Sequence, residues 1–469
     1  GAAVRHFSET EETYDHTAYV AALRAGRKVE PLQFKKQVAK QYYVTVRNDE
    51  GVIVGNAALL DKLPSAAALG QDRVRGNIEV AVHAPNILAL YEKEIRQRRD
   101  SVLEAVRAGA GAPAAGGDAA ARLSRTLGAN FDVALSLARQ LAWVEAALEF
   151  HSGQLKLRLA APPLPGSGFS RALAGQQPRD ADARLMAMLP PDIAMLGTMR
   201  FAKTPEWTGF LLEMMRPIVE ACATNSTAES AAQLQATCRA AVESRGDAFA
   251  LAVLAPATNQ TASDVVEVVR VADAARARQA QRKAVEARLP LCGAAVQPEV
   301  AGKTKYESNI ARHAGVEIDR VTVELAAPAN AQLGSNFVRQ VAFAGQFELI
   351  AQGPRATNNI RRLIAAAKTP PAAAGAPRLK AAAALFPPKH NGIFYLNLAD
   401  YFGLMRSAVF PASEDPQMRH LQMLLAEAKA DVAGCLLLQP HAPVVELVVP
   451  LDKLVEVFSK KVTAAPATP

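Results

Sequence analysis

Two distant parts of the chain carry the same succession of apolar and polar positions. Residues 76–88 and residues 391–402 each read as a short strand that runs into a polar or proline-bearing helix start. Alternation with a period of two is typical of a half-buried strand, and recurrence at three or four residues is typical of an amphipathic helix. The two runs therefore predict one architecture that occurs twice.

A hairpin precedes each of these strands. The early hairpin is predicted over residues 41–55, and the late one over residues 338–351, where a helix over 356–368 follows it. Beyond the early strand we predict a helix over 131–150. Its buried face is formed by apolar residues at three- and four-residue steps, namely Val133, Leu137, Leu141, Val144 and Leu148.

These elements predict an α+β fold made of two related units, each an antiparallel sheet covered by helices. The first unit is expected at residues 1–188, with a flexible Gly/Ala-rich insert at 109–120, and the second at residues 189–462. Residues 463–469 are expected to form a disordered tail.

The early unit has far fewer residues before its hairpin than the late unit, and this predicts that it is incomplete on its N-terminal side. Because proteins avoid bare sheet edges, we expect the early sheet to be smaller than the late one, or to be completed by residues outside 1–190. Those residues would come from the second unit, from another chain or from a longer precursor.

Charge and hydropathy exclude some classes of function. The formal net charge of +8 predicts weak, non-specific attraction to anionic surfaces. The densest basic runs, at residues 94–99 and 276–283, are not interleaved with aromatic residues, so we predict solvated helix faces and no specific nucleic-acid binding. The longest apolar stretch, residues 433–451, is broken by prolines and polar residues and predicts two strands, so no transmembrane helix is expected.

The four cysteines form no Cys-x-x-Cys pair, which argues against a zinc or thioredoxin-type site. Cys222 and Cys238 flank a polar stretch and form a disulfide if the compartment is oxidising. The alternative is that both are buried thiols.

No metalloprotease, phosphate-loop or nucleophile-elbow motif occurs in the chain, and the histidines are scattered. We therefore predict no catalytic residue, metal ligand or cofactor. Five methionines gather around one segment and suggest an apolar ligand or partner surface, although core packing also explains them: Met186, Met195, Met199, Met214 and Met215.

The strand that leads into the Ala399-Asp400 helix start, the preceding hairpin and helix, and the Ala-rich linkers together resemble large, duplicated, uncharacterised α+β proteins of bacterial envelopes. Position 85 carries Pro85 where the late copy has Asp400, so the two copies differ there. The resemblance implies an α+β fold and a periplasmic or extracellular location, and it implies no activity.

The chain is therefore interpreted as a non-enzymatic envelope protein that binds a partner protein or a cell-surface component, as a subunit of a larger assembly. A carrier of an apolar ligand or lipid is the alternative. A hydrolase with a site assembled between the two units is a further alternative.

Overall fold

The computed structural model describes residues 5–14, 35–47, 50–54, 77–107, 117–180, 182–223, 228–255, 264–286, 301–325, 336–369, 377–401 and 430–462, together with residues 18, 22 and 25. The chain divides into two compact units. The smaller unit comprises residues 1–73 and 92–124, and the larger unit comprises residues 74–91 and 125–469.

The smaller unit contains a three-stranded antiparallel sheet in the order β1 (Arg5–Tyr14), β2 (Lys35–Arg47) and β3 (Glu50–Val54). The predicted early hairpin is confirmed, because β2 and β3 pair from Tyr43↔Val54 to Arg47↔Glu50. Parts of two helices also belong to this unit, α3 (Ala84–Arg107) and α4 (Gly117–Ala138). The buried Ser124 hydroxyl joins them by donating to the Leu103 carbonyl at 3.2 Å.

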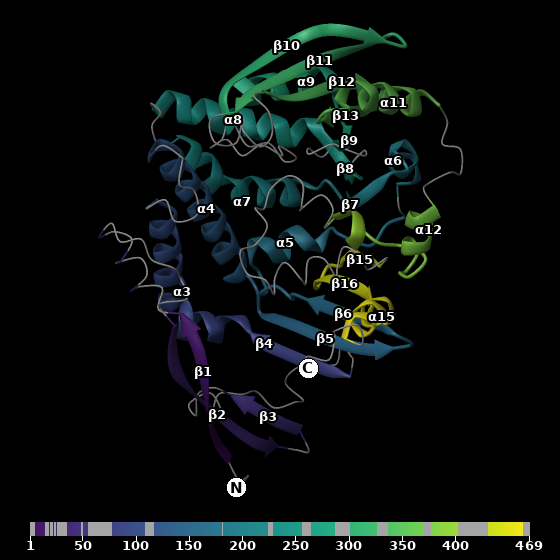
Figure 1. Cartoon of the computed structure of the whole chain (residues 1–469). Helices are drawn as coiled ribbons and strands as arrows, with labels where there is room; N and C mark the ends of the chain where they lie inside the picture. Colours follow the sequence, from purple (N-terminus) through teal and green to yellow (C-terminus); the bar gives the residue numbers. More distant parts are fainter. Residues whose placement is uncertain are drawn as a thin grey trace, which may run out of the picture. The chain divides into compact units, whose positions relative to one another are not determined.

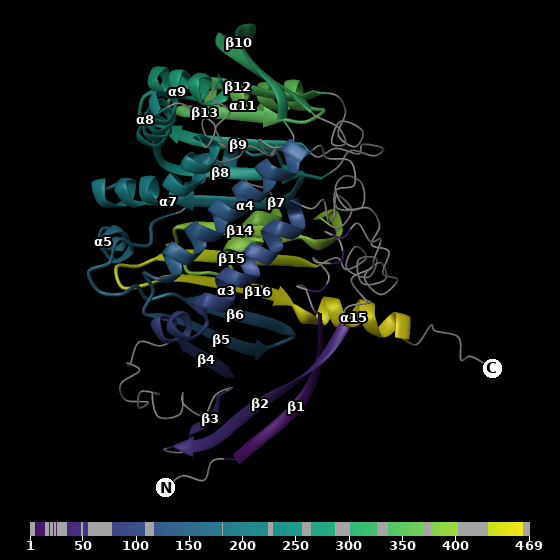
Figure 2. The ribbon, with the colours of Figure 1, turned by 90° about the vertical axis from the view of Figure 1, so that its left-hand side faces the viewer.

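The larger unit is built on one sheet of thirteen strands, and each neighbouring pair is antiparallel. Figure 2 shows these strands side by side, in the order β10-β11-β12-β13-β9-β8-β7-β14-β15-β16-β6-β5-β4. In chain order the strands are β4 (Ile78–His83), β5 (Trp143–His151), β6 (Gln154–Ala160), β7 (Ile193–Arg200), β8 (Arg245–Leu254), β9 (Val265–Val271), β10 (Ala301–His313), β11 (Val316–Leu325), β12 (Asn336–Ala344), β13 (Phe347–Gln352), β14 (Gly392–Asn397), β15 (Asp431–Leu438) and β16 (Pro443–Pro450).

Helices cover both faces of this sheet around β13, which is buried along its whole length. Leu349 packs against Ile360 and Leu363 of one helix layer, whereas its neighbour Ile350 packs with Val285 on the other side. In Figure 1, α6, α11 and α12 lie to the right of the strands, and α7 and α8 lie to the left. The helices of this unit are α5 (Gly168–Ala174), α6 (Ala183–Met188), α7 (Pro205–Ala223), α8 (Ala228–Ser244), α9 (Ala274–Glu286), α11 (Ala356–Lys368), α12 (Pro377–Ala383) and α15 (Leu451–Val462).

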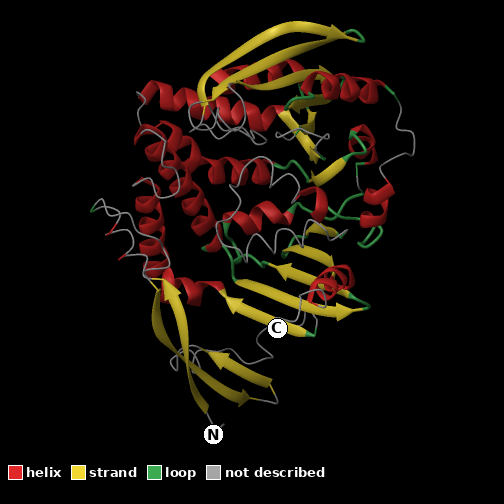
Figure 3. Cartoon of the chain, in the orientation of Figure 1, coloured by secondary structure: helices red, strands yellow, loops and turns green. Residues whose placement is uncertain are grey.

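The mixed α+β class and the large antiparallel sheet agree with the sequence-based prediction. At one end of this sheet, the hairpin β10–β11 curves above α9 (Figure 3). A separate sheet for each predicted unit is wrong, because strands from residues 1–188 and from residues 189–462 share the same sheet. The expectation that the early strands are completed by residues outside 1–190 is confirmed for β4, β5 and β6. Strand β6 pairs with β16 over seven residues, from Val444↔Ala160 to Pro450↔Gln154. The register brings Arg158 opposite the buried Glu446, with Arg158 Nε 3.2 Å from Glu446 Oε1.

The helix predicted over residues 131–150 is also wrong in its second half. Helix α4 ends at Ala138, and Trp143–His151 form β5. Val144 and Leu148 are four residues apart, a spacing that fits one face of a helix and equally fits one face of a strand. Residues 117–120 of the predicted flexible insert begin α4, and the rest of the insert and the tail at 463–469 lie outside the described residues.

The predicted duplication is not confirmed. The two hairpins that should correspond lie in different sheets, since β2–β3 belong to the three-stranded sheet and β13 pairs with β9 in the large one. The order strand, two helices, two strands, helix instead recurs along the larger sheet, in β4–α5 and in β7–α9. A third stretch, β14–α15, starts in the same way, because residues 398–401 are helical, and residues 402–429 lie outside the described residues.

The continuity of the sheet across β6 and β16 can be tested with a paired cysteine variant. Leu157 and Leu447 are directly opposite each other, and opposite residues of antiparallel strands have Cβ atoms about 4.5–5.5 Å apart. We expect Leu157→Cys with Leu447→Cys to form a disulfide on mild oxidation, detected as a linked peptide by mass spectrometry. The control, Leu157→Cys with Leu251→Cys, joins non-neighbouring strands and should give none. A linked control, or an unlinked test pair, would contradict the strand order.

Candidate functional site

One face of the large sheet is apolar across eight neighbouring strands, from β8 to β4. The antiparallel registers place these side chains on the same face, since directly opposite residues point the same way. We call this surface the open apolar face. It consists of Phe249, Leu251 and Val253 on β8, Met195 and Met199 on β7, Phe394 and Leu396 on β14, Val432 and Leu436 on β15, Val445, Leu447 and Val449 on β16, Leu155, Leu157 and Leu159 on β6, Val144, Ala146, Leu148 and Phe150 on β5, and Ile78, Val80 and Val82 on β4.

Large side chains of the open apolar face remain exposed. Six of them expose between 37% and 53% of their surface: Phe394, Phe249, Val144, Ile78, Phe150 and Val80. The opposite face of β7, β14 and β15 is buried in the main core through Leu196, Tyr395 and Cys435. In the middle of the sheet both faces are therefore apolar, and among the described residues the main core closes only one of them, while Leu396 and Val432 on the other face pack in a small cluster with Leu398, Ala430 and Leu454.

Part of the open apolar face is covered at the end of the strands near α5 and α7. Met199 and Leu436 pack against a cluster that contains Phe169, Trp207 and Phe210. The rings of Phe169 and Phe210 are stacked, with their centroids 5.1 Å apart. This cluster forms a border for the open face.

The five predicted methionines do not form a single surface. Met195 and Met199 lie on the open apolar face, and Met214 of α7 packs in the same cluster as Met199. Met215 points to a different cluster between α7, α8 and α9, and Met186 of α6 packs against the main core behind the sheet. Some of the five methionines therefore lie on the open apolar face, and the others pack in the buried clusters.

The predicted Cys222–Cys238 disulfide stays a prediction, because the side chain of Cys222 lies outside the described residues. Cys238 is buried, and its sulfur lies 3.9 Å from the sulfur of Met215. Cys435 is also buried, and burial together with the nearby Glu446 carboxylate raises the pKa of its thiol to about 12. Such a thiol stays protonated at neutral pH and is a poor nucleophile.

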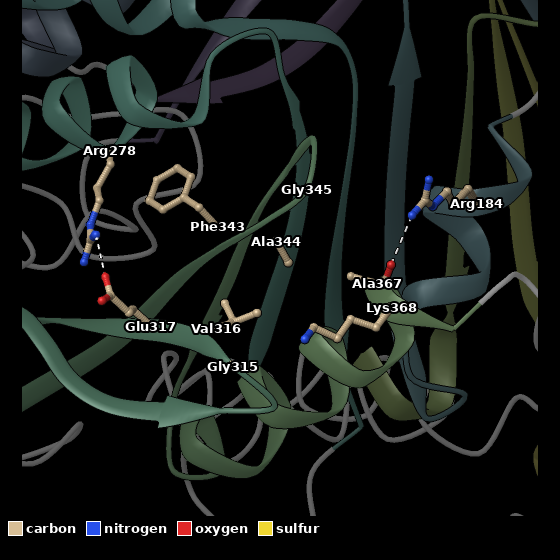
Figure 4. A pocket seen from close by; sticks show the side chains of 10 residues that line it. All are labelled: Arg184, Arg278, Gly315, Val316, Glu317, Phe343, Ala344, Gly345, Ala367 and Lys368. Atoms are coloured by element: carbon tan, nitrogen blue, oxygen red, sulfur yellow. Dashed lines mark hydrogen bonds and ion pairs between the residues drawn. The ribbon is translucent and has the colours of Figure 1, made fainter.

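A second candidate site is a pocket of about 430 Å³ at the turns of two hairpins, shown in Figure 4. Gly315 and Gly345 form its turn edges, and Arg184, Arg278 and Lys368 approach from α6, α9 and α11. Each of these cations is already engaged. The Lys368 ammonium donates to the Ala314 carbonyl, Arg184 donates to the Ala367 carbonyl at 3.1 Å and stacks 4.9 Å from the Phe347 ring centroid, and Arg278 pairs with Glu317 at 3.0 Å.

Beside this pocket, a buried carboxylate organises the β10–β11 hairpin. Asp319 accepts hydrogen bonds from Arg278 at 2.7 Å, from the Tyr306 hydroxyl and from the Asn309 amide at 2.9 Å. Burial alone would raise the pKa of Asp319, but these hydrogen bonds outweigh burial, and its pKa lies below the ordinary value. Asn309 has a left-handed backbone with φ of 57° in a register shift of the hairpin, and its hydrogen bond to Asp319 holds that shift in place.

Further polar groups are buried under α9, on the strands next to the open apolar face. Glu267 and Arg339 are both almost fully buried, with Arg339 NH2 and Glu267 Oε1 3.6 Å apart, and Arg245 lies 3.8 Å from the buried Glu348. Burial raises the pKa of Glu267, and the charges of Arg339 and Arg245 oppose that rise. These two ion pairs balance in charge, which is consistent with a structural role.

The described histidines do not converge. The His83 ring lies 4.7 Å from Trp143 on β5, His390 is buried with a pKa lowered by burial, and His441 is exposed between β15 and β16. Among the described residues, no group of three or more His, Cys, Asp or Glu side chains is placed to hold a metal ion. No described helix is both long enough and apolar enough to cross a membrane.

Both predicted basic runs lie on helices. Glu94, Arg96 and Arg98 of α3 are exposed, as predicted, and so are Arg276 and Arg282 of α9. Arg278 differs from its neighbours because Asp319 and Glu317 hold it against the sheet. This pairing could not be predicted from the sequence, since the two carboxylates come about forty residues later, on β11.

Comparisons with protein families, with curated proteins and with solved structures found no match. The resemblance to envelope proteins therefore stays a prediction, and function has to be argued from the surfaces of this molecule.

Removing the buried carboxylate should destabilise the fold in a pH-dependent way. Asp319→Asn removes the charge that accepts hydrogen bonds from Arg278, Tyr306 and Asn309, and the loss of hydrogen bonds to a buried charged group costs about 1.5–3 kcal/mol of unfolding free energy. Because the folded pKa of Asp319 is lowered, its contribution is complete above its unfolded pKa, about 4, and is lost as the pH falls through the folded value. The unfolding free energies of the variant and the wild type, measured in urea, should therefore converge as the pH drops below about 4.

The matched control for this measurement is Glu317→Gln. Glu317 pairs with the same arginine from an exposed position, so its loss should cost less than about 1 kcal/mol at neutral pH. Equal costs for the two variants at pH 7 would show that burial does not decide the strength of this cluster.

Proposed function

We propose that this protein is a non-enzymatic binding protein whose open apolar face docks a partner protein. The observation that carries the proposal is the exposure of six large apolar side chains on one face of the sheet, on strands β8, β14, β5 and β4. Soluble proteins rarely expose continuous apolar patches larger than a few hundred Å², and larger ones mark interaction sites. Burying such a surface contributes about 25 cal/mol per Å², which makes docking favourable.

The amphipathic pattern of β5 and β6 supports this proposal. Their other face carries Glu149, Lys156 and Arg158, which suit solvent, whereas Val144, Leu148 and Leu157 suit a covered face. An antiparallel sheet with one polar and one apolar face normally packs its apolar face against another layer. A partner that supplies this layer explains why the apolar residues are kept at the surface.

The shape of the surface favours a macromolecule over a small ligand. Small-molecule sites are concave and enclose most of their ligand. Two pockets of the described residues lie elsewhere, at the hairpin turns beside α11 and between α7 and α8. A protein interface instead extends over about 800 Å² on each partner, and the open apolar face extends over eight neighbouring strands. The periplasmic or extracellular location and the role in a larger assembly are part of this proposal and rest on the sequence pattern.

Substitutions on the face should weaken binding of apolar probes. We expect Phe394→Gln and Phe150→Gln together to lower the fluorescence of the bound apolar dye ANS by about half or more, and to weaken binding of a labelled amphipathic Leu/Lys helical peptide. Leu385→Gln is the matched control, because Leu385 is 45% exposed and lies outside the face. Dye and peptide binding that stay at wild-type levels in the face variant would refute the proposal.

A flotation experiment separates a protein partner from a membrane surface. Vesicles of phosphatidylcholine and phosphatidylglycerol should not retain the wild-type protein at physiological salt. Retention that disappears in the Phe394→Gln, Phe150→Gln variant but not in Leu385→Gln would assign the face to lipid and overturn the proposal of a protein partner.

A further inference from the structure

The two outer strands of the large sheet are built differently. Strand β10 carries Lys305, Glu307 and Arg312 and has two register irregularities against β11. Charged residues and bulges are the means by which proteins keep a free edge from pairing with another chain. Strand β10 is therefore a protected edge.

Strand β4 is less protected, because it has no register irregularity and few charged residues. Its sequence is Ile-Glu-Val-Ala-Val-His, with a single charged residue, and its register against β5 is regular over all six residues. Among the described strands it pairs only with β5. Ile78 and Val80, both on the open apolar face, expose 51% and 53% of their surface. No described strand pairs with the outer side of β4, so within the described part of the chain its backbone groups there have no partner strand.

The interior of the sheet shows which kind of strand fits such an edge. The recurring strand triplets stand in the order β9-β8-β7, β14-β15-β16 and β6-β5-β4. In chain order, β7 and β14 are the first strands of their triplets, and they pair with each other antiparallel. Strands β16 and β6 are the last strands of their triplets, and they also pair antiparallel. At each junction between triplets, a first strand therefore pairs with a first strand, or a last strand with a last strand. Strand β4 is the first strand of its triplet, so the same rule predicts that it pairs with another first strand.

We propose that β4 pairs antiparallel with β4 of a second copy of this chain, so that the two large sheets join across a twofold axis. The proposal goes beyond the proposed function, because it concerns the backbone edge of β4 and not the side chains across the open face. The same chain supplies an identical edge in every copy, and a twofold axis makes that edge self-complementary.

The pairing of β14 with β7 predicts the register. Strands β4 and β14 each have six residues and each run directly into a helix, so Val80–Val82 correspond to Phe394–Leu396, the residues that pair with β7. A symmetric pairing through these positions is centred on Ala81. It places Val80 opposite Val82 of the partner subunit on the apolar face, and Glu79 opposite His83 of the partner subunit on the other face.

The first test is the oligomeric state of the full chain, measured by analytical ultracentrifugation. The wild type should be a dimer. Val80→Lys with Val82→Lys brings four ammonium groups together across the twofold axis and should raise the dimer Kd by more than about tenfold, because like charges at an interface are strongly unfavourable. Val144→Lys places a charge on the same apolar face one strand inward, 41% exposed, and should leave the dimer unchanged.

A cysteine variant tests the register even if the lysine variant fails to fold. In a pairing centred on Ala81, Ala81→Cys faces itself, so mild oxidation should give a covalent dimer on a non-reducing gel. Glu149 lies on the neighbouring strand β5, on the same face as Ala81. The Glu149→Cys variant and the wild type should form no covalent dimer, and both should therefore run at the monomer mass on that gel. A monomeric wild-type chain, or no cross-link through Ala81→Cys, would overturn the proposal.

These outcomes are separate from those of the proposed function. A monomeric chain whose dye binding still depends on Phe394 and Phe150 would remove the β4 pairing and leave the docking face. A dimer that is lost equally in Val144→Lys would show that the apolar face, and not the β4 edge, joins the two copies, and this would also overturn the β4 pairing.

Discussion

The pairing of β6 with β16 is the interaction on which the larger unit depends. It joins residues 154–160 to residues 443–450 and connects strands β4, β5 and β6 to the rest of the sheet. Without it, β6 and β16 would each present a row of unpaired backbone groups, which proteins avoid. The opposite positions of Arg158 and Glu446 fit this register, because a shift by one residue would carry the charge of Glu446 to the apolar face.

The open apolar face is a consequence of this pairing. On β5 and β6 one face is polar, so their apolar side chains must share the other face with those of β14, β15 and β16. The main core closes the opposite side of the central strands, where Leu196, Tyr395 and Cys435 are buried. The sheet thus concentrates apolar surface on one side, and this is the surface on which the proposed docking of a partner rests.

Local features of the fold could be predicted from the sequence, and non-local ones could not. The β2–β3 and β12–β13 hairpins follow from alternation around short polar turns, and Gly345, with φ of 59°, supplies the left-handed turn that β12–β13 needs. The helix expected over residues 131–150 failed because Val144 and Leu148 satisfy both periods. The ion pairs of Asp319 and of Glu446 were not predictable, because their partners come together only through strand order. The methionine-rich stretch pointed to an apolar surface that includes Met195 and Met199 of β7. Only the strand registers show that these two share a face with Phe394 and Leu447.

Hydrogen exchange at the junction of β6 and β16 tests the central claim most directly. If the sheet is continuous, the amides of residues 155–159 and 444–449 should all exchange slowly, with protection close to that of the buried strand β13, since strands inside a sheet have both backbone edges paired. If β6 and β16 were instead the edges of two separate sheets, every second amide in each strand would face solvent. Fast exchange at alternate residues in both segments would contradict the account.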